Sequence, residues 1–313
     1  MMEPKPRSDD NARSIGKVPR HRYISVMPTI ALATYAAAPE LPPDDQILAR
    51  VLVRRGADAR PVRWDAKVDW SAFDTVVVRS CWDYHLRHAE FLGWIDHVET
   101  AGVPLHNAAS ILRWNSDKRY LRDLERAGVG VVHTRWSDAG SGTPTLAAVL
   151  AEEGWGDVVI KPAISASATE TWRVPAGRAA EWEDRFRAMA ARGPAMIQPF
   201  IAEVATAGEW SLVFIGGEFS HSVLKLPAPG DFRVQEEHGG TQQARDADAE
   251  VVRAAQAVLA RVPGAPSYAR VDGCLIDGRF RVMEVELIEP TLYFTEGPRA
   301  AERLADLILA GGR

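Results

Sequence analysis

Cysteine and long apolar segments are both scarce in this sequence. The 313 residues include only two cysteines, Cys81 and Cys274. Neither belongs to a Cys-x-x-Cys pair and no Cys/His run has zinc spacing, which disfavours a disulfide scaffold and a zinc module and fits a reducing cytoplasm. No stretch approaches the roughly 18 apolar residues of a membrane span. The basic N-terminus lacks an apolar segment with a cleavage site, so it does not resemble a secretory signal.

An excess of positive charge is also absent. The formal net charge is -5, which argues against a general nucleic-acid-binding protein but leaves room for a local basic pocket around a small anion. Hydrophobic residues make up 46% and charged residues 25%, ordinary values for a soluble globular protein. At roughly 150 residues per domain, the length suggests about two domains.

The first third of the chain predicts a parallel sheet. Residues 1–27 form a polar extension that we expect to be mobile, and Met27 is a candidate start. Short apolar strands are predicted near residues 30–34, 61–64 and 75–78, with helices after Asp44, a predicted N-cap, and over residues 88–100. Alternating strands and helices indicate a doubly wound sheet, which binds ligands at the carboxyl ends of its strands. Residues 34–35 and 79–83 are therefore expected to line a crevice.

The remainder of the chain predicts antiparallel sheet with helices. Residues 115–118 open a helix, with Ser116 or Asp117 as its cap, and apolar strands follow at residues 158–161 and 196–198. Two hairpins are indicated, one around Gly216-Gly217 and one around Asp277-Gly278. With further helices over residues 250–262 and 299–310, the expected fold class is α/β plus α+β.

The second hairpin carries a concentration of carboxylates. Asp272 lies five residues before Asp277 and Glu284 lies six after Gly278, so the two are nearly opposite, and Glu286 shares a face with Glu284. Like charges that face each other destabilise a sheet and call for a cation. Oxygen ligands on one rigid face suit Mg²⁺, especially Mg²⁺ that also contacts phosphates. A solvated face of an exposed hairpin is the alternative interpretation.

Lysines at two positions are candidate phosphate ligands. Lys161 ends an apolar strand and precedes a Ser/Ala-rich stretch that includes Ser165 and Ser167, whose backbone N–H groups could close over phosphate oxygens. The stretch lacks the Walker pattern. Lys118 lies on the capped helix. For either lysine, a surface side chain with no ligand is the competing interpretation.

Taken in order, these elements resemble a known family. The order is a lysine, a strand-ending lysine with a small-residue loop, the run Gln-Pro-Phe-Ile-x-Glu from Gln198 to Glu203, and then Arg-x-Asp and Glu-x-Glu on a late hairpin. This order resembles the ATP-grasp superfamily of carboxylate–amine ligases, in particular its glutathione-synthetase-like branch. The resemblance covers roughly two thirds of the chain, from about Asn115 onward. It implies a small N-terminal parallel-sheet (pre-ATP-grasp) domain at residues 28–114, followed by a two-lobed ATP-grasp fold with a central lobe at 115–195 and a C-terminal lobe at 196–313.

The resemblance also implies ATP and Mg²⁺, with two metal ions, as cofactors. The implied nucleotide ligands are Lys118, Lys161, Ser165, Ser167, Gln198, Phe200, Ile201, Glu203 and Glu209. The implied metal ligands are Asp272, Glu284 and Glu286. Glu286 departs from the family, in which this residue is usually Asn, and the Ser/Ala-rich loop departs from the Gly-rich loop of many relatives.

The implied reaction has two steps. A substrate carboxylate attacks the γ-phosphoryl group to give an acyl phosphate, and a nitrogen nucleophile then displaces phosphate to form an amide. Positioning and charge neutralisation supply most of such catalysis. Lys225, Arg233 and Arg270 are the candidate catalytic cations, with structural salt bridges as the alternative role.

Other segments resemble a smaller subgroup. The runs from Val78 to His85, from Arg113 to Leu121 and from Glu289 to Tyr293 look like the subgroup that includes cycloserine synthetase, the O-ureido-serine cyclo-ligase of antibiotic biosynthesis. A small amino-acid substrate implies Arg79 for its carboxylate and Asp83 or Glu289 for its ammonium group, and Trp82 either contacts substrate or packs in the core.

Two alternatives remain open from the sequence. One is an intermolecular peptide or amide ligase of the glutathione-synthetase type. The other is a catalytically inactive ATP-binding regulatory protein. The expected partner is a small amino-acid-like molecule, with neither nucleic acid nor membrane, and the sequence leaves the oligomeric state open.

Overall fold

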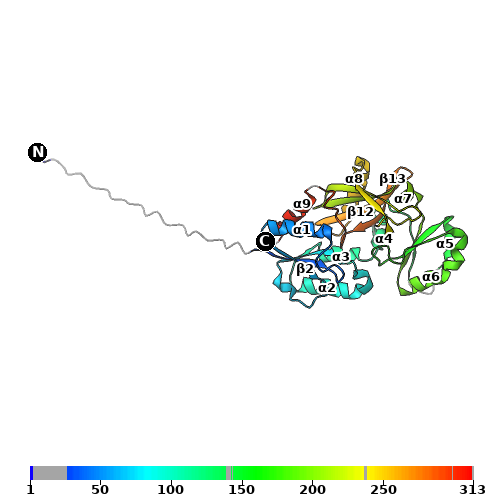
Figure 1. Ribbon diagram of the computed structural model, residues 1–313, viewed down its shortest axis with the longest axis horizontal. Coiled ribbons are helices and arrows are strands. Elements are labelled where there is room, and N and C mark those ends of the chain that lie inside the picture. The colour runs from blue at the N-terminus through cyan, green and yellow to red at the C-terminus, as the bar shows by residue number, and fades with distance from the viewer. Residues whose placement is uncertain (3–26, 139–141, 143, 236–237, 298, 312–313) are drawn as a thin grey trace.

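The computed structural model describes residues 1–2, 27–138, 142, 144–235, 238–297 and 299–311. The predicted N-terminal extension therefore lies almost entirely outside the described residues. Three sheets follow one another along the chain, and Figure 1 shows the N-terminal sheet and the central lobe at opposite ends, with the C-terminal lobe joining them. Across the described residues, no helix has the length and apolar character needed to span a membrane.

The N-terminal sheet is parallel, as predicted. Its strand order is β2-β1-β3-β4, and helices lie on both of its faces. Asp44 does not cap the first helix, because Pro42 occupies the cap position and the Asp44 carboxylate instead accepts the backbone N–H groups of Leu292 and Phe294. The elements of this domain are β1 Thr29–Thr34, α1 Pro43–Arg54, β2 Asp58–Arg63, β3 Thr75–Ser80, α2 His88–Thr100 and β4 Leu105–His106, with 3₁₀ turns at Trp70–Ala72 and Tyr84–Arg87.

The central lobe has its own antiparallel sheet, of order β5-β8-β6-β7. Side chains from its strands and its two α-helices form a core that, among the described residues, has members only from this lobe. The predicted boundary between residues 195 and 196 falls inside β8, which pairs with β5 and β6, so the lobe extends to Pro199. The elements are β5 Arg135–Ser137, α5 Leu146–Glu153, β6 Val158–Pro162, β7 Trp172–Val174, a 3₁₀ turn at Ala176–Arg178, α6 Ala179–Arg192 and β8 Ala195–Pro199.

The C-terminal lobe is built on a five-stranded antiparallel sheet of order β11-β10-β9-β12-β13. Both predicted hairpins are present. Gly216 and Gly217 take φ angles of 62° and 81°, and Asp277 and Gly278 take 50° and 71°, as two-residue hairpin turns of this hand require. The elements are α7 Ala202–Thr206, β9 Glu209–Ile215, β10 Glu218–Leu226, β11 Thr241–Ala244, α8 Ala249–Leu259, β12 Tyr268–Ile276 and β13 Arg279–Glu286.

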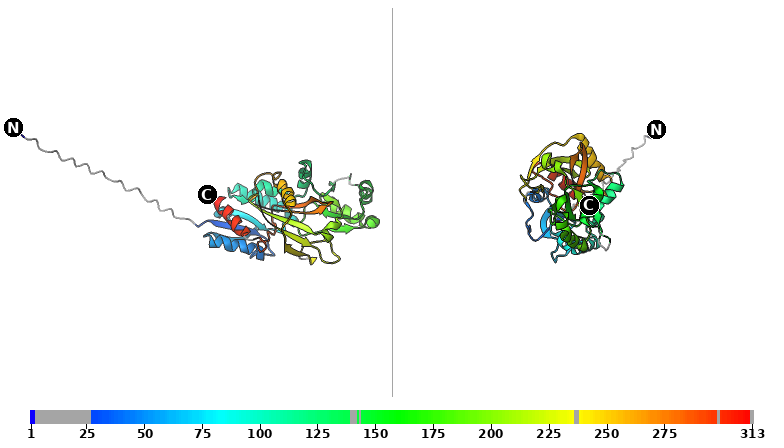
Figure 2. Two further views of the ribbon diagram at one scale, coloured as in Figure 1. Left: turned by 90° about the horizontal axis from the view of Figure 1, so that it is seen from above. Right: turned by 90° about the vertical axis from the view of Figure 1, so that its right-hand side faces the viewer.

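Three helices pack against a domain other than the one to which the prediction assigns them. Apolar residues of α3 (Ala109–Asn115) and α4 (Tyr120–Arg126) pack into the core of the C-terminal lobe, so residues 115–126 are not part of the central lobe's core. The closing helix α9 (Ala300–Gly311) returns to the N-terminal domain and lies beside α1 in Figures 1 and 2. Leu304 and Ile308 share a core there with Leu48 and Leu52. The two ends of the chain therefore fold together.

Asn107 connects the N-terminal domain to the C-terminal lobe. Its side-chain N–H₂ donates to the carbonyls of Tyr268 and Leu287 at 2.9 and 2.8 Å, and its oxygen accepts the N–H of Ser267 at 2.6 Å and that of Tyr268 at 3.4 Å. The side chain is 1% exposed. Loss of these bonds would leave several backbone groups buried without partners.

We expect Asn107→Ala to lower the free energy of unfolding by about 3 kcal/mol or more, because each unsatisfied buried polar group costs roughly 1–3 kcal/mol. Asn115→Ala is the matched comparison, since Asn115 makes only two such bonds, to Val285 and Leu287, and should cost about half as much. Urea denaturation of both variants measures the difference. Equal losses would show that the extra bonds of Asn107 add nothing.

Candidate active site

A cavity of about 690 Å³ lies between the lobes and collects most of the predicted site residues. Side chains from the central and C-terminal sheets, from the loops after β1 and β3 and from the segment after β13 contribute to its wall. Arg79, Asp83 and Glu203 are the predicted site residues that do not line it. Those that do are Trp82, Lys118, Lys161, Ser165, Ser167, Gln198, Phe200, Ile201, Glu209, Lys225, Arg233, Arg270, Asp272, Glu284, Glu286 and Glu289.

The spacing predicts that Asp272 and Glu284 lie nearly opposite each other, and a bulge in the second hairpin pairs them directly. Asp272 pairs with Glu284 and Arg270 with Glu286 in the register of β12 and β13, and the register shifts by one residue directly after Asp272. Such a bulge redirects side chains and is common beside functional sites. Both pairs of side chains therefore face the cavity from one rigid surface.

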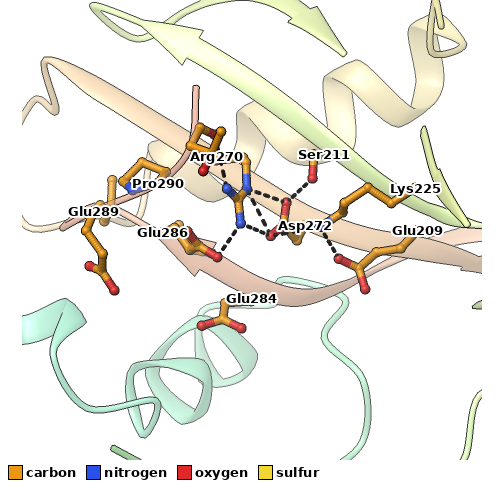
Figure 3. Close-up of polar contacts among 12 residues, drawn as sticks. Glu209, Ser211, Lys225, Arg270, Asp272, Glu284, Glu286, Glu289 and Pro290 are labelled. Atoms are coloured by element: carbon orange, nitrogen blue, oxygen red, sulfur yellow. Dashed lines mark hydrogen bonds and ion pairs between the residues drawn. The ribbon is translucent and has the colours of Figure 1, made fainter. Parts of the chain in front are cut away.

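Arg270 lies at the centre of these carboxylates (Figure 3). Its guanidinium donates to Asp272 from Nε at 3.0 Å and from Nη2 at 2.9 Å, and it also pairs with Glu286. Ser211 donates its hydroxyl to Asp272 at 2.6 Å. Burial alone would raise the pKa of Asp272, but the charges of Arg270 and Lys225 hold it at about 2. Burial raises the pKa of Glu286 to about 7 in spite of Arg270.

Lys225 on β10 joins a second set of charges. Its Nζ lies 2.5 Å from a Glu209 oxygen and 3.6 Å from Asp272. Burial disfavours the ammonium, but the charges of Asp272 and Glu209 raise the pKa of Lys225 well above its usual range. Burial also raises the pKa of Glu209, against the attraction of Lys225. Lys225 is therefore a permanently charged group at the cavity wall.

The two other lysines approach from the central-lobe side. Lys118 lies 3.0 Å from a Glu284 oxygen, and its Nζ donates to the backbone carbonyl and the hydroxyl of Ser165. Burial lowers the pKa of Lys161, and within the described residues it has no ion-pair partner. The loop after Lys161 has three non-glycine residues with positive φ, namely Ser167, Ala168 and Glu170. This conformation is one that glycine adopts without strain.

The donor set of the hairpin has the chemistry of a magnesium site. Within the described part of the chain, no three acidic, His or Cys side chains converge as they would around a bound metal, because Arg270 and Lys118 hold the carboxylates as ion pairs. Mg²⁺ in proteins often takes only one or two carboxylates and completes its shell with water and substrate phosphates. Asp272, Glu284 and Glu286 therefore fit a metal held jointly with a phosphate ligand.

An apolar region forms the end of the cavity beside β8. Phe200, Ile201 and Val204 line it, and the ring of Phe232 lies 6.2 Å from that of Phe200 at an interplanar angle of 78°. The guanidinium carbon of Arg173 lies over the Phe200 ring, 3.7 Å from its centroid. This region can take a flat aromatic group, whereas the charged groups described above lie beside it.

The predictions for Arg79 and Asp83 need correction. Arg79 is 1% exposed and is bound to Asp45 at 2.8 Å, so it cannot reach a ligand in the cavity. Asp83 accepts the indole N–H of Trp64 at 2.8 Å and also lies away from the cavity. Arg79 is buried near the end of β3, whereas Asp83 follows that strand, is partly exposed and is bound to Trp64.

Trp82 and Glu289 do line the cavity, at its N-terminal-domain side. The Trp82 indole N–H donates to the backbone carbonyl of Glu289 at 3.0 Å, and the Tyr35 ring lies 5.8 Å from that of Trp82. Burial, and then the charge of Glu286, raise the pKa of Glu289 above its usual range. This part of the cavity combines two aromatic rings with a carboxylate.

Thr291 and Tyr293 are lining residues that sequence reasoning did not identify. With Glu289 they follow a period of two, whereas Leu292 between them is fully buried in the core. Such alternation is typical of extended chain with one face buried. The period was visible in the sequence, and it could have identified both residues.

Comparison with known proteins gives one family. Residues 30–107 match the model of the N-terminal domain of D-cycloserine synthetase DcsG. Cycloserine biosynthesis protein DcsG of Streptomyces lavendulae is 31% identical over 303 residues, which are 90% of this chain and 98% of that protein. The crystal structure of D-cycloserine synthetase DcsG superposes with a TM-score of 0.82 at 31% identity, covering 91% of this chain and all of that one.

More distant structures share the fold. The D-alanine–D-alanine ligase of Bacillus anthracis has a TM-score of 0.66 at 16% identity, over 91% of this chain and 97% of that one. The ATP-grasp ligase PsnB, in a complex that includes Mg and ADP, has a TM-score of 0.61 at 15% identity, over 91% of this chain and 99% of that one.

Proposed function

Because this chain belongs to the cycloserine-synthetase family of ATP-grasp ligases, which form C–N bonds with ATP and Mg²⁺, we propose that it closes a ring within one small amino acid, converting O-ureido-serine to cycloserine. The observation that carries the proposal is the composition of the cavity. The same cavity holds cations and hairpin carboxylates, an apolar region, and a small aromatic-and-acidic region. The charged groups and the apolar region suit MgATP, and the aromatic-and-acidic region suits one small zwitterion.

The nucleotide would lie along the central and C-terminal lobes. The adenine ring fits the apolar region at Phe200 and Ile201, beside Gln198. Lys118 and Lys161 would hold phosphate oxygens, with the backbone around Ser165 and Ser167 closing over them. Glu209 would lie near the triphosphate. Glu203, on α7 outside the cavity wall, would reach the ribose only if that helix moved inward.

Asp272, Glu284 and Glu286 would hold Mg²⁺, two ions in our proposal, together with phosphate oxygens. When bound, Mg²⁺ neutralises charge on the phosphates and so assists phosphoryl transfer. Lys225, Arg233 and Arg270 would stabilise the transferring phosphoryl group and the oxyanion at the attacked carbonyl. Arg270 and Lys225 are rigidly placed for this, since each is buried and held by carboxylates.

The proposed reaction balances with one water molecule. The substrate carboxylate attacks the γ-phosphorus, and ADP leaves. The oxygen-linked ureido nitrogen then attacks the acyl carbon, phosphate leaves and that nitrogen loses its proton, which closes a five-membered ring. Hydrolysis of the carbamoyl group, with release of CO₂ and ammonia, gives cycloserine. The protein contributes orientation, because both reacting groups belong to one small molecule.

Incubation of the enzyme with MgATP and O-ureido-serine alone tests the proposal. We expect ADP release with no added amine, and a product whose mass matches cycloserine. ADP release only after addition of a second amine would favour an intermolecular amide ligase. ATP binding without ADP release from any small carboxylate would favour a regulatory protein.

A further inference from the structure

Residues 288–293, the strap, form a segment without regular secondary structure that comes after β13 and carries Glu289, Thr291 and Tyr293 into the cavity wall. Tyr293 has a φ of 49°, which non-glycine residues adopt only when their surroundings impose it. Its neighbours provide such constraints. Asp44 accepts the N–H groups of Leu292 and Phe294 at 3.1 and 2.7 Å, and Arg270 donates to the Thr291 carbonyl at 3.0 Å.

Arg79 holds the strap at Pro290, one residue beyond Glu289. Its Nη2 donates to the Pro290 carbonyl at 2.7 Å, and its Nε donates to Asp45 at 2.8 Å. Ser80 donates its hydroxyl to the same carboxylate, and the guanidinium lies 4.9 Å from the centre of the Tyr268 ring. The orientation of Arg79 is therefore fixed from three sides.

The Arg79–Asp45 pair contributes more to geometry than to stability. The two side chains are 1% and 5% exposed, and the desolvation of a buried ion pair offsets most of its attraction. A bond from a fixed guanidinium to a backbone carbonyl, by contrast, sets the direction of the adjacent residue. Trp82 holds the preceding carbonyl, that of Glu289, in the same way.

Glu289 is the residue whose position these bonds determine. Figure 3 shows its carboxylate apart from the cluster around Arg270, and within the described residues it has neither an ion-pair partner nor a hydrogen-bond partner. Trp82, which donates to the backbone carbonyl of Glu289, and Tyr35, whose ring lies 5.8 Å from that of Trp82, line the same cavity. A carboxylate with aromatic faces is the chemistry that binds an ammonium ion.

We propose that Glu289, Trp82 and Tyr35 form a subsite for the protonated amine of the substrate, and that the buried Arg79–Asp45 pair is a positioning device that aims Glu289 through the Pro290 carbonyl. The proposal rests on the proposed function, in which the substrate is a small amino acid. It also restricts the substrate class, because the amine of the amino acid must be free and positively charged.

A double-mutant cycle of Arg79→Lys and Glu289→Gln tests the positioning role. The KM for O-ureido-serine and the KM for ATP are measured in the wild type, in each variant and in the double variant. We expect each single variant to raise the KM for O-ureido-serine about tenfold, the KM for ATP to change less than twofold, and the double variant to resemble Glu289→Gln alone. Arg113→Lys, in a surface ion pair of the same domain, is the control and should change neither constant.

The des-amino analogue, 3-(carbamoylaminooxy)propanoic acid, tests the subsite itself. We expect the wild type to use it with a much higher KM, and Glu289→Gln to discriminate far less between it and O-ureido-serine. Additive effects in the cycle, or an equal rise in the KM for ATP, would overturn the positioning role. Unchanged discrimination in Glu289→Gln would overturn the subsite.

Hydrogen exchange of peptides from residues 288–293 separates failure of this proposal from failure of the proposed function. Wild-type enzyme that releases no ADP from O-ureido-serine would refute the function alone. Arg79→Lys should still accelerate exchange in the strap and not in the central lobe, whereas unchanged strap exchange would refute the positioning role. Asp45→Asn, which keeps the shape of the partner, provides the same test if Arg79→Lys does not fold.

Discussion

Replacement of Glu284 by Gln, or of Asp272 by Asn, is expected to lower kcat for ADP release by about a thousandfold or more, on the scale of losing one preorganised charge in an active site. Both carboxylates face the cavity from paired positions of β12 and β13, where we propose that they hold Mg²⁺. Coupled ADP assays at saturating substrate measure the effect. Titration with Mn²⁺ followed by electron paramagnetic resonance measures metal binding independently of turnover.

The two variants should differ in stability. Glu284 has a 30% exposed side chain and one ion pair, with Lys118, so Glu284→Gln should keep the Tm close to that of the wild type. Asp272 is buried and accepts bonds from Arg270 and Ser211, so Asp272→Asn should fold with a lower Tm. Glu218→Gln, at an exposed position on β10, is the control. Wild-type turnover in both Glu284→Gln and Asp272→Asn would show that these carboxylates do not hold a catalytic Mg²⁺.

Lys225→Met is expected to lower kcat/KM by about a thousandfold and to destabilise the fold by roughly 3–5 kcal/mol. The stability loss follows because Glu209 would remain buried without its cation and Asp272 would lose one of two, and breaking a buried ion pair in this way is costly. The activity loss follows because a fixed charge at the phosphoryl group would be gone. Urea denaturation and steady-state kinetics measure the two effects.

The double variant Lys225→Met/Glu209→Gln separates these effects. Neutralising Glu209 removes the carboxylate that Lys225 contacts most closely, so much of the stability should return while kcat/KM stays low. Recovery of both together would mean that the activity loss of Lys225→Met was a folding defect. If the double variant stays unstable, Lys225 stabilises the fold mainly through its charge interaction with Asp272 and not with Glu209.

The site on the C-terminal hairpin could be predicted because it is local in sequence. A two-residue turn fixes the register near it, so counting from Asp277-Gly278 brings Asp272 within one residue of Glu284, and the bulge directly after Asp272 then pairs the two residues. The binding partners of those carboxylates could not be counted in this way. Lys225 and Lys118 reach them from separate elements, and nothing in the local pattern indicates which lysine meets which carboxylate.

Arg79 shows why the site residues outside this hairpin could not all be predicted from the sequence. The carboxyl end of β3 does face the ligand-binding edge of the sheet, as the parallel topology requires. However, Asp45 and the carbonyl of Pro290, 211 residues later, occupy the guanidinium before any ligand can. The lobe boundaries were imprecise for a similar reason, because β8, α4 and α9 each pack against an element that is distant in sequence.

The separate core of the central lobe has a consequence for how a nucleotide enters. A rigid rotation of that lobe would leave its internal apolar contacts intact, whereas Met196 on β8 and Trp136 on β5 pack against the core of the C-terminal lobe. Opening would also replace with bonds to water those from Lys118 Nζ to Ser165 and from the Lys118 backbone N–H to the Ala163 carbonyl. Access to the cavity would thus require contacts between lobes to change, while the core of the central lobe stays folded.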